Sequence, residues 1–261
     1  MDTLERARRV ATRLGIKAGL VKGEPDLHAF GIDAAEQRRM RQTPPTEVHR
    51  AFYSHGKRPA HKWAHYLHLY DRYLDRYRGT AVKMIEIGVL EGGSLDMWRR
   101  YLGPDASIVG IDIDPRCAQR VDPPNVVRIG SQADRAFLEG VAAEFGAPEL
   151  ILDDGSHIAR HQRASFEILF PLLQDGGLYI IEDAHTSYWN EWDGGYRRRG
   201  TAIELAKSLV DDIHAWCHHK GSAAKANEDV GSVHFHDSVI VIEKRRRQRP
   251  GQMSSEGGRD A

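Results

Sequence analysis

The 261-residue chain has little of several features that mark whole classes of protein. Its 2 cysteines, Cys117 and Cys217, are too few for a disulfide framework or for a metal site built on thiolates. It has no uninterrupted apolar run of about 18 residues, the length that crosses a membrane, and residues 1–20 lack the apolar core of a signal peptide. The sequence therefore predicts a protein of the reducing cytoplasm with no membrane partner.

Neither sign of charge is in excess. Lys and Arg together number 37, and Asp and Glu together also number 37. Since a chain without net charge has no general attraction for nucleic acid or for an anionic surface, we expect a small-molecule or oligosaccharide partner. The length is sufficient for one substantial hydrophobic core.

Short apolar runs recur from residue 82 onward, separated by stretches with helical spacing. They are too brief for helices and resemble buried strands. Five of them cover 82–87, 107–111, 126–129, 150–153 and 178–182, and two more cover 232–235 and 238–243. This alternation predicts an α/β, Rossmann-like fold with a mostly parallel seven-stranded sheet that ends in an antiparallel hairpin.

The chain is predicted to have three parts. Residues 1–60 form an N-terminal extension, with an amphipathic helix for packing or dimer contact followed by an irregular arm over 21–60 that is interrupted by prolines. Residues 61–244 form the α/β domain, which begins with a helix over 61–77. Residues 245–261 are basic and then rich in Gly and Ser, and we expect them to be disordered. We also expect a homo-oligomer, with a dimer as the first expectation.

A glycine turn follows the first predicted strand. Gly88 and Gly92 are present, but the middle glycine of a dinucleotide motif is missing. Glu86 and Glu91 flank the place where a pyrophosphate would bind, and acidic groups instead suit the cationic sulfonium and ammonium of S-adenosylmethionine. Glu86 is predicted to face the methionine end, and Asp112 to accept from the ribose hydroxyls. A turn that serves only helix packing is the alternative.

Further side chains are expected to surround the same nucleoside. Ser131, Gln132 and Asp134 follow the third strand and would edge the adenine. The residues predicted to bind the cofactor are Glu86, Gly88, Gly92, Ser94, Asp112, Ser131, Gln132, Asp134 and Asp153.

Carboxylates also follow the fourth and fifth strands. Because neighbouring strands lie about 4.8 Å apart, Asp154, Glu182 and Asp183 could ligate one ion, and oxygen ligands favour Mg²⁺ or Mn²⁺. His157 lies three residues after Asp154, with Ser156 as a predicted N-cap, so we expect a neutral imidazole that acts as general base. Alternatively, Asp154 could be a turn residue, His157 a helix-start residue, and Glu182-Asp183 a solvated strand end.

Aromatic residues crowd the insertion over 185–200. Tyr188, Trp189 and Trp192 could stack on a sugar face and exclude water, or could pack at a subunit contact. Lys62, His65 and Tyr66 on the earlier helix could complete the substrate pocket, or could serve only core and surface roles.

Over about residues 80–200 the chain resembles class I S-adenosylmethionine-dependent methyltransferases, and more narrowly the Mg²⁺-dependent sugar O-methyltransferases typified by the mycinamicin 2''-O-methyltransferase. The resemblance is carried by 152–157, by 170–173 before Gly176-Gly177, and by 179–183 followed by 186–189. It implies that Asp154, Glu182 and Asp183 hold the metal and that His157 is the base. The family's usual Asp-Lys before the first helix appears here as His61-Lys62.

The resemblance implies methyl transfer from S-adenosylmethionine to a hydroxyl of a sugar or oligosaccharide. A mycobacterial member that acts in polysaccharide biosynthesis, by 1-O-methylation of methylmannose oligosaccharides, is the specific candidate. A catechol-type O-methyltransferase with an aromatic or polyketide acceptor is the alternative enzyme. A non-catalytic nucleoside-binding protein is opposed by the retained base and ligands, and a nicotinamide-dependent dehydrogenase by the missing glycine.

Overall fold

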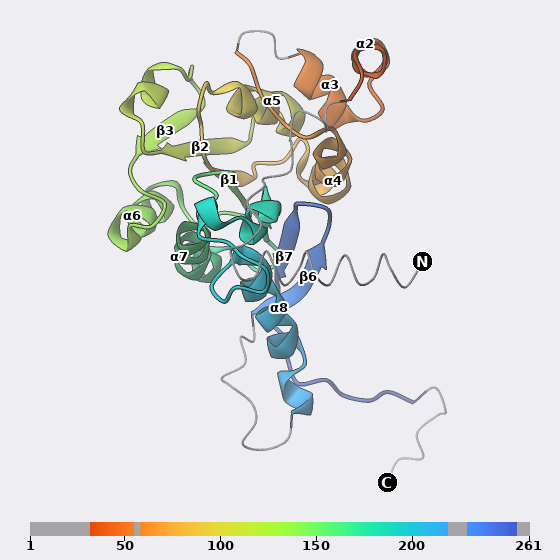
Figure 1. The fold of residues 1–261 in the computed structure, drawn as a ribbon, viewed down its shortest axis with the longest axis vertical. Coiled ribbons are helices and arrows are strands. Elements are labelled where there is room, and N and C mark those ends of the chain that lie inside the picture. Colours follow the sequence, from red (N-terminus) through yellow and green to blue (C-terminus); the bar gives the residue numbers. More distant parts are fainter. Residues whose placement is uncertain (1–31, 55–57, 219–228, 255–261) are drawn as a thin grey trace.

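The computed structural model describes residues 32–54, 58–218 and 229–254, and its centre is a seven-stranded sheet (Figure 1). The strand order is β3-β2-β1-β4-β5-β7-β6. The strands are β1 (Lys83–Ile87), β2 (Ser107–Asp112), β3 (Val126–Ile129), β4 (Leu150–Asp153), β5 (Leu178–Ile181), β6 (Val230–Phe235) and β7 (Ile240–Lys244).

The strand directions confirm the predicted α/β fold. Strands β1 to β5 are parallel, and β7 runs antiparallel to both β5 and β6. Every residue of β4 and β5 is buried, which explains why these segments are continuous apolar runs without alternation. The predicted strand segments coincide with the observed ones to within about two residues at each end.

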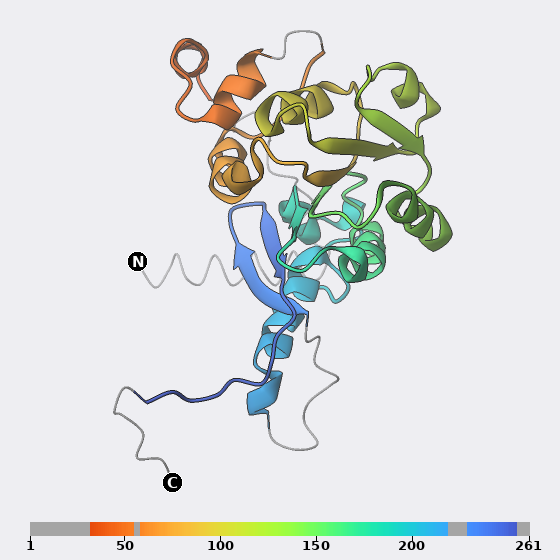
Figure 2. The same cartoon turned by 180° about the vertical axis from the view of Figure 1, so that it is seen from behind.

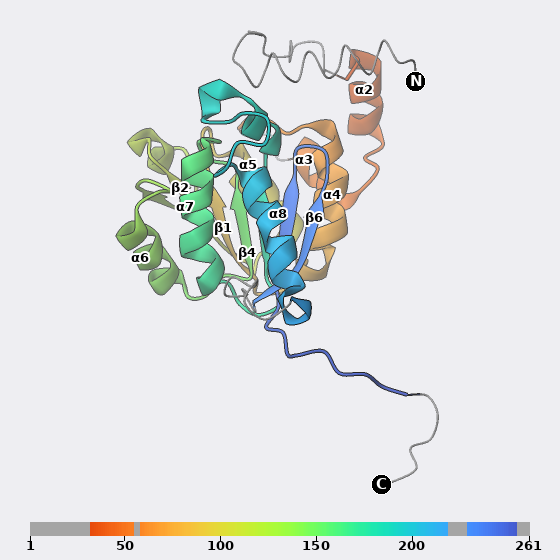
Figure 3. The ribbon, with the colours of Figure 1, turned by 60° about the horizontal axis from the view of Figure 1, so that its bottom comes forward.

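Helices cover both faces of the sheet (Figure 3). One core, which contains Tyr66, Tyr70 and Trp98, lies beneath α3, α4 and α5. The other contains Phe166 and Phe170 and lies beneath α6, α7 and α8. The α-helices are α2 (Ala34–Gln42), α3 (Glu47–Ser54), α4 (Ala64–Leu74), α5 (Gly93–Leu102), α6 (Arg135–Phe145), α7 (Ala159–Leu169) and α8 (Ala202–Ile213). Short 3₁₀ helices span Asp75–Tyr77, Pro115–Gln119, Phe170–Leu172, Ala184–Tyr188, Asn190–Trp192 and Ala215–Cys217.

The prediction of an irregular arm is wrong for much of 21–60. The N-cap of helix α2 is Asp33, whose carboxylate accepts hydrogen bonds from the backbone of Ala35 and Glu36. Helix α3 buries Val48 and Ala51 in the core beneath α3, α4 and α5. Prolines 44 and 45 lie between the two helices, so they separate the helices without interrupting either one. Figure 2 shows α2, α3 and α4 gathered beside α5.

Helix α4 contacts the hairpin of β6 and β7 through two side chains. It accounts for most of the helix predicted over 61–77. Tyr73 Oη lies 2.9 Å from His236 Nε2, and His65 Nε2 lies 3.0 Å from the carbonyl of Asp237. The predicted role of His65 in the substrate pocket is therefore replaced in this structure by a contact with the hairpin.

The two ends of the chain are described only in part. The amphipathic helix predicted near the N-terminus lies outside the described residues, as do residues 255–261 of the predicted disordered tail. Residues 245–254 contain no helix or strand. Within the described part of the chain, no helix is both long enough and apolar enough to span a bilayer.

Candidate active site

The carboxyl ends of the parallel strands surround a cavity of about 640 Å³. This is the edge at which parallel α/β sheets bind ligands. We call this cavity the donor cavity. It is lined by residues at or beyond the ends of β1, β2, β3, β4 and β5, namely Gly88, Ser94, Asp112, Ser131, Gln132, Asp154, His157 and Asp183, and by Pro59, His61, Leu90, Ile113 and His161.

The turn after β1 approaches the end of β4 very closely. Gly88 has φ +94°, and a Cβ placed there would lie 2.0 Å from the carbonyl oxygen of Asp154. The backbone N–H of Asp154 donates to Ile87 at 2.9 Å, so the two segments are also joined by a hydrogen bond. Only glycine fits this position, both for its conformation and for the space.

We expect Gly88→Ala to destabilise the protein by about 2–4 kcal/mol, because the strain and the clash together must displace the backbone at Asp154. Binding of S-adenosylhomocysteine should weaken as well. Chemical denaturation and calorimetry measure the two effects. The matched control is Gly140→Ala in α6, where a Cβ meets nothing within 4 Å. Equal stability of both variants would contradict the close approach.

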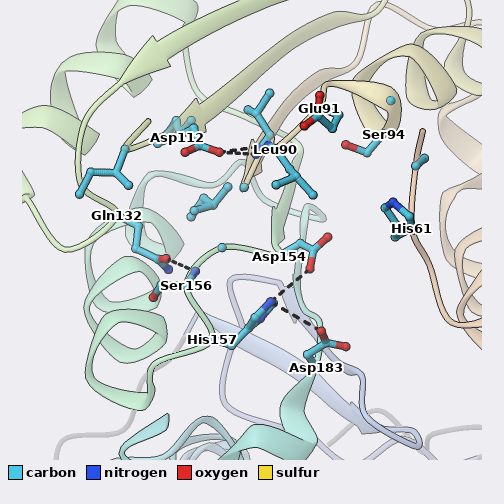
Figure 4. A pocket seen from close by; sticks show the side chains of 18 of the residues that line it. His61, Leu90, Glu91, Ser94, Asp112, Gln132, Asp154, Ser156, His157 and Asp183 are labelled. Atoms are coloured by element: carbon cyan, nitrogen blue, oxygen red, sulfur yellow. Dashed lines mark hydrogen bonds and ion pairs between the residues drawn. The ribbon is translucent and has the colours of Figure 1, made fainter. Parts of the chain in front are cut away.

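Asp112 holds the same turn from β2. Its Oδ2 accepts hydrogen bonds from the backbone of Val89 at 2.9 Å and Leu90 at 3.1 Å, and its Oδ1 accepts from Asp114 at 2.9 Å. Partial burial would raise the pKa of Asp112, but these backbone donors lower it overall. The carboxylate is therefore charged and is held against the backbone of Val89 and Leu90 (Figure 4).

An acidic centre, formed by Asp154, His157 and Asp183, lies in the same cavity, and His157 sits between the two carboxylates (Figure 4). Its Nε2 is 3.8 Å from Asp154 Oδ1 and 3.6 Å from Asp183 Oδ2, and one donor atom of each residue lies within 4.8 Å of the others. His157 and Asp183 both have left-handed backbones, with φ of 55° and 50°. Such strain in non-glycine residues is often found at functional sites. The converging carboxylates fit a hard divalent cation such as Mg²⁺ or Mn²⁺.

The prediction that Ser156 caps helix α7 is wrong. The N-cap is Ile158, without a side-chain hydrogen bond, while the Ser156 hydroxyl lies 2.9 Å from His161 Nδ1. His157 therefore precedes the helix. Its Nδ1 is buried and has no hydrogen-bond partner among the described residues, and its ring lies edge-on to Trp192 at 5.8 Å.

Lys62 gives the acidic centre its positive charge. Its Nζ lies 2.6 Å from Asp154 Oδ2 and 2.7 Å from Glu182 Oε1, and only 1% of its side chain is exposed. Burial alone would lower the pKa of Lys62, but Asp154 and Glu182 raise it overall, so the ammonium is retained. Glu182, predicted as a metal ligand, thus faces an ammonium in this structure.

Tyr66 orients one ligand of the acidic centre. Its hydroxyl donates to Asp183 Oδ1 at 2.7 Å, while the other oxygen of Asp183 faces His157. Burial and the charge of Asp183 raise the pKa of Tyr66, so it remains a donor. Tyr66 was predicted in the substrate pocket, and it lies instead behind the carboxylate.

Several residues predicted to bind the cofactor line the donor cavity, namely Gly88, Ser94, Asp112, Ser131 and Gln132. Glu86 is fully buried, and it accepts from Ser94 Oγ at 2.9 Å and Trp98 Nε1 at 3.0 Å. Burial raises the pKa of Glu86 to about 7, against the opposing charge of Lys62. Glu86, predicted to face the methionine end of the cofactor, does not line the donor cavity, whereas its partner Ser94 does.

The remaining predicted cofactor residues support the surrounding backbone. Asp153 is fully buried and accepts from Gln132 Nε2 at 3.1 Å and from the Tyr179 hydroxyl at 3.2 Å. Asp134 caps α6 by accepting from the backbone of Phe137. Gly92, with φ 82°, is the N-cap of α5.

The aromatic insertion lies beside the acidic centre. Trp192 packs against His157, and the ring of Trp189 lies 4.7 Å from that of His185. Tyr188 is 43% exposed.

Sequence reasoning missed a second cavity, of about 460 Å³, beyond Lys62. We call it the outer cavity. It is lined by Ile32, Gln37, Phe52, Tyr53, Ala60, His61, Lys62, Trp63, Ala64, Leu67, Asp154, Glu182 and Asp183. The nearest sequence signal was the His61-Lys62 pair, which precedes helix α4 and lines both cavities.

Comparisons with known proteins relate this site to methyltransferases, although no protein-family model matches the chain. The chain is 34% identical over 248 residues to the 8-demethyl-8-(2-methoxy-alpha-L-rhamnosyl)-tetracenomycin-C 3'-O-methyltransferase of Streptomyces olivaceus, covering 88% of this chain and 63% of that protein. It is 36% identical over 200 residues to the mycinamicin VI 2''-O-methyltransferase of Micromonospora griseorubida, covering 70% and 48%. The chain thus spans about half to two thirds of the length of these relatives.

A solved structure gives the same relationship in three dimensions. A methyltransferase from the mycinamycin biosynthetic pathway, in complex with Mg, SAH and mycinamycin VI, matches with a TM-score of 0.71 and 28% identity, over 92% of this chain and 70% of that one. An O-methyltransferase from Bacillus cereus in complex with SAH, at 15% identity and a TM-score of 0.53, shares the fold. The chain therefore has the fold of class I methyltransferases.

Proposed function

We propose that this chain, which has the class I methyltransferase fold and is similar along most of its length to sugar O-methyltransferases, transfers a methyl group from S-adenosylmethionine to a sugar hydroxyl. One observation carries the proposal: the glycine turn with Asp112 and the acidic centre of Asp154, His157 and Asp183 open into one cavity. The first group suits a nucleoside, and the second suits a divalent cation and proton transfer.

The residues of the chain have distinct tasks in this reaction. When bound, S-adenosylmethionine would supply the methyl group: an oxygen–carbon bond to the acceptor forms as the carbon–sulfur bond breaks, and the electron pair of the broken bond stays on sulfur. Mg²⁺ would supply positive charge that lowers the pKa of an acceptor hydroxyl. Asp112 and the turn from Gly88 would hold the nucleoside. Asp154 and Asp183 would hold the cation, with Glu182 as the further predicted ligand.

His157 would accept the proton of the acceptor hydroxyl. Its Nε2 points toward the two carboxylates and into the donor cavity (Figure 4). The carboxylates of Asp154 and Asp183, at 3.8 and 3.6 Å from Nε2, orient the ring. Tyr66 and Lys62 would fix Asp183 and Asp154 in place, so that orientation supplies much of the rate enhancement.

The proposed acceptor is a sugar of a glycosylated small molecule or an oligosaccharide. The relatives named above are O-methyltransferases of a rhamnosyl-tetracenomycin C and of mycinamicin VI. Methylmannose oligosaccharides are a second proposed acceptor class. Cytoplasmic location and a homodimer remain predictions.

The experiment that tests the proposal has two parts. Calorimetry should show binding of S-adenosylhomocysteine and none of NAD. A methyl-transfer screen should then show activity on rhamnosides or mannosides in the presence of Mg²⁺. Transfer to catechols alone would replace the sugar with the catechol-type alternative, and NAD binding would remove the methyltransferase assignment.

Asp112→Ala should weaken binding of S-adenosylhomocysteine by about 2–4 kcal/mol, because charge-assisted hydrogen bonds to the ribose are lost. The turn should also loosen, since the same carboxylate accepts from Val89 and Leu90. Asp112→Asn keeps one acceptor oxygen and should lose less affinity. Calorimetry of both folded variants is the measurement, and unchanged affinity in Asp112→Ala would remove the ribose assignment.

A further inference from the structure

The outer cavity lies against the N-terminal helices. Gln37 comes from α2, Phe52 and Tyr53 come from α3, and Trp63 is the N-cap of α4. The rings of Phe52 and Tyr53 meet edge to face at 5.1 Å. Its walls thus combine aromatic side chains with the charged groups of the acidic centre, and its volume of about 460 Å³ falls within the usual range for small-molecule sites.

The outer cavity shares one wall with the donor cavity. Residues 60–62, Asp154 and Asp183 line both of them. Methyl transfer is an in-line displacement, so the acceptor oxygen must approach the methyl carbon from the side opposite to sulfur. An acceptor placed in the outer cavity would reach the acidic centre from the side away from the nucleoside turn.

We propose that the outer cavity binds the sugar ring of the acceptor, with one hydroxyl directed to Asp154 and Asp183; this rests on the proposed function. Aromatic faces pack well against the C–H groups of a pyranose ring, and Phe52, Tyr53 and Trp63 provide such surfaces. Gln37 and His61 provide polar groups for the remaining hydroxyls. Helices α2 and α3, which precede the sheet, thereby determine acceptor specificity.

This assignment differs from the sugar platform predicted for the insertion over 185–200. Trp189 packs on His185, and Trp192 packs on His157. The ring of His185 lies in turn 5.8 Å from that of Trp63. Residues 185–200 line neither cavity. The insertion packs beside His157 and Trp63 instead, and the proposed sugar-contacting surface belongs to the N-terminal helices.

The test compares three variants of the full chain in the presence of S-adenosylhomocysteine and Mg²⁺. Saturation-transfer NMR with methyl alpha-L-rhamnopyranoside and methyl alpha-D-mannopyranoside measures sugar binding, and calorimetry measures the affinity for S-adenosylhomocysteine. Tyr53→Ala and Gln37→Ala change the outer cavity. Tyr188→Ala changes the competing site, since Tyr188 is an aromatic residue of the insertion that is 43% exposed.

We expect Tyr53→Ala to weaken sugar binding by about tenfold, Gln37→Ala by a smaller factor, and Tyr188→Ala by less than about twofold, with affinity for S-adenosylhomocysteine unchanged in all three. Unchanged far-UV circular dichroism shows that each variant folds. Loss of sugar binding in Tyr188→Ala but not in the other two would overturn the outer cavity as the sugar site. A wild type that binds S-adenosylhomocysteine but methylates only catechols would instead refute the sugar acceptor itself.

Discussion

Removal of divalent cations should reduce methyl transfer by at least about 10³-fold, because several kcal/mol of charge stabilisation at the acceptor hydroxyl are lost. Activity should return when Mg²⁺ is added back after dialysis. Asp154→Asn and Asp183→Asn should show the same loss without rescue, since each variant removes a carboxylate of the acidic centre. Binding of S-adenosylhomocysteine should change little, because Asp112 and the glycine turn are unaltered.

The matched control for these substitutions is Glu139→Gln, which changes an exposed carboxylate on α6 that pairs with Arg135. Activity assays with and without EDTA and titration with Mn²⁺ are the measurements. Full turnover in EDTA would exclude the cation from the reaction. Normal Mn²⁺ affinity in both asparagine variants would place the cation elsewhere.

The second large effect is expected for His157. His157→Ala should reduce turnover by about 10²- to 10⁴-fold, the usual contribution of a positioned proton acceptor. Because only the neutral imidazole accepts a proton, the wild-type rate should rise with pH, and this ionisation should disappear from the profile of the variant. Affinity for S-adenosylhomocysteine and for Mn²⁺ should be retained.

The affinity for Mn²⁺ distinguishes between two possible roles of His157, as a proton acceptor and as a metal ligand. His157 Nε2 is near enough to Asp154 and Asp183 to serve as a third ligand. If it is a ligand, His157→Ala should weaken Mn²⁺ binding by about 10- to 100-fold, comparable to the loss of other residues at metal sites. Near-normal turnover with an unchanged pH profile would show that the cation alone activates the hydroxyl.

The sheet could be predicted from the sequence because its central strands are buried on both faces. Their apolar runs are short and continuous, and the segments between them have helical spacing, so strands and helices can be distinguished in the sequence. The position of the site followed from the same pattern, since Asp112, Asp154 and Asp183 lie at or just beyond the ends of parallel strands.

The N-terminal helices could not be predicted in the same way. Helix α2 has no buried residues, so it shows no apolar stripe, and α3 is only eight residues long. The pairing of Lys62 with Asp154 and Glu182 joins positions 92 and 120 residues apart, a contact that local patterns do not contain. The sequence predicts Ser156 as the N-cap of α7, but its hydroxyl contacts His161 of the helix and the N-cap is Ile158.

Lys62 has a consequence for how the protein would acquire the proposed metal. Buried carboxylates without a cation repel one another and destabilise a fold by several kcal/mol, and many metal sites therefore assemble only when the ion is present. Here an ammonium supplied by the chain neutralises part of the acidic centre. If the acidic centre holds a cation as proposed, this ammonium would let the chain fold before the cation binds, and the cation could be exchanged without refolding.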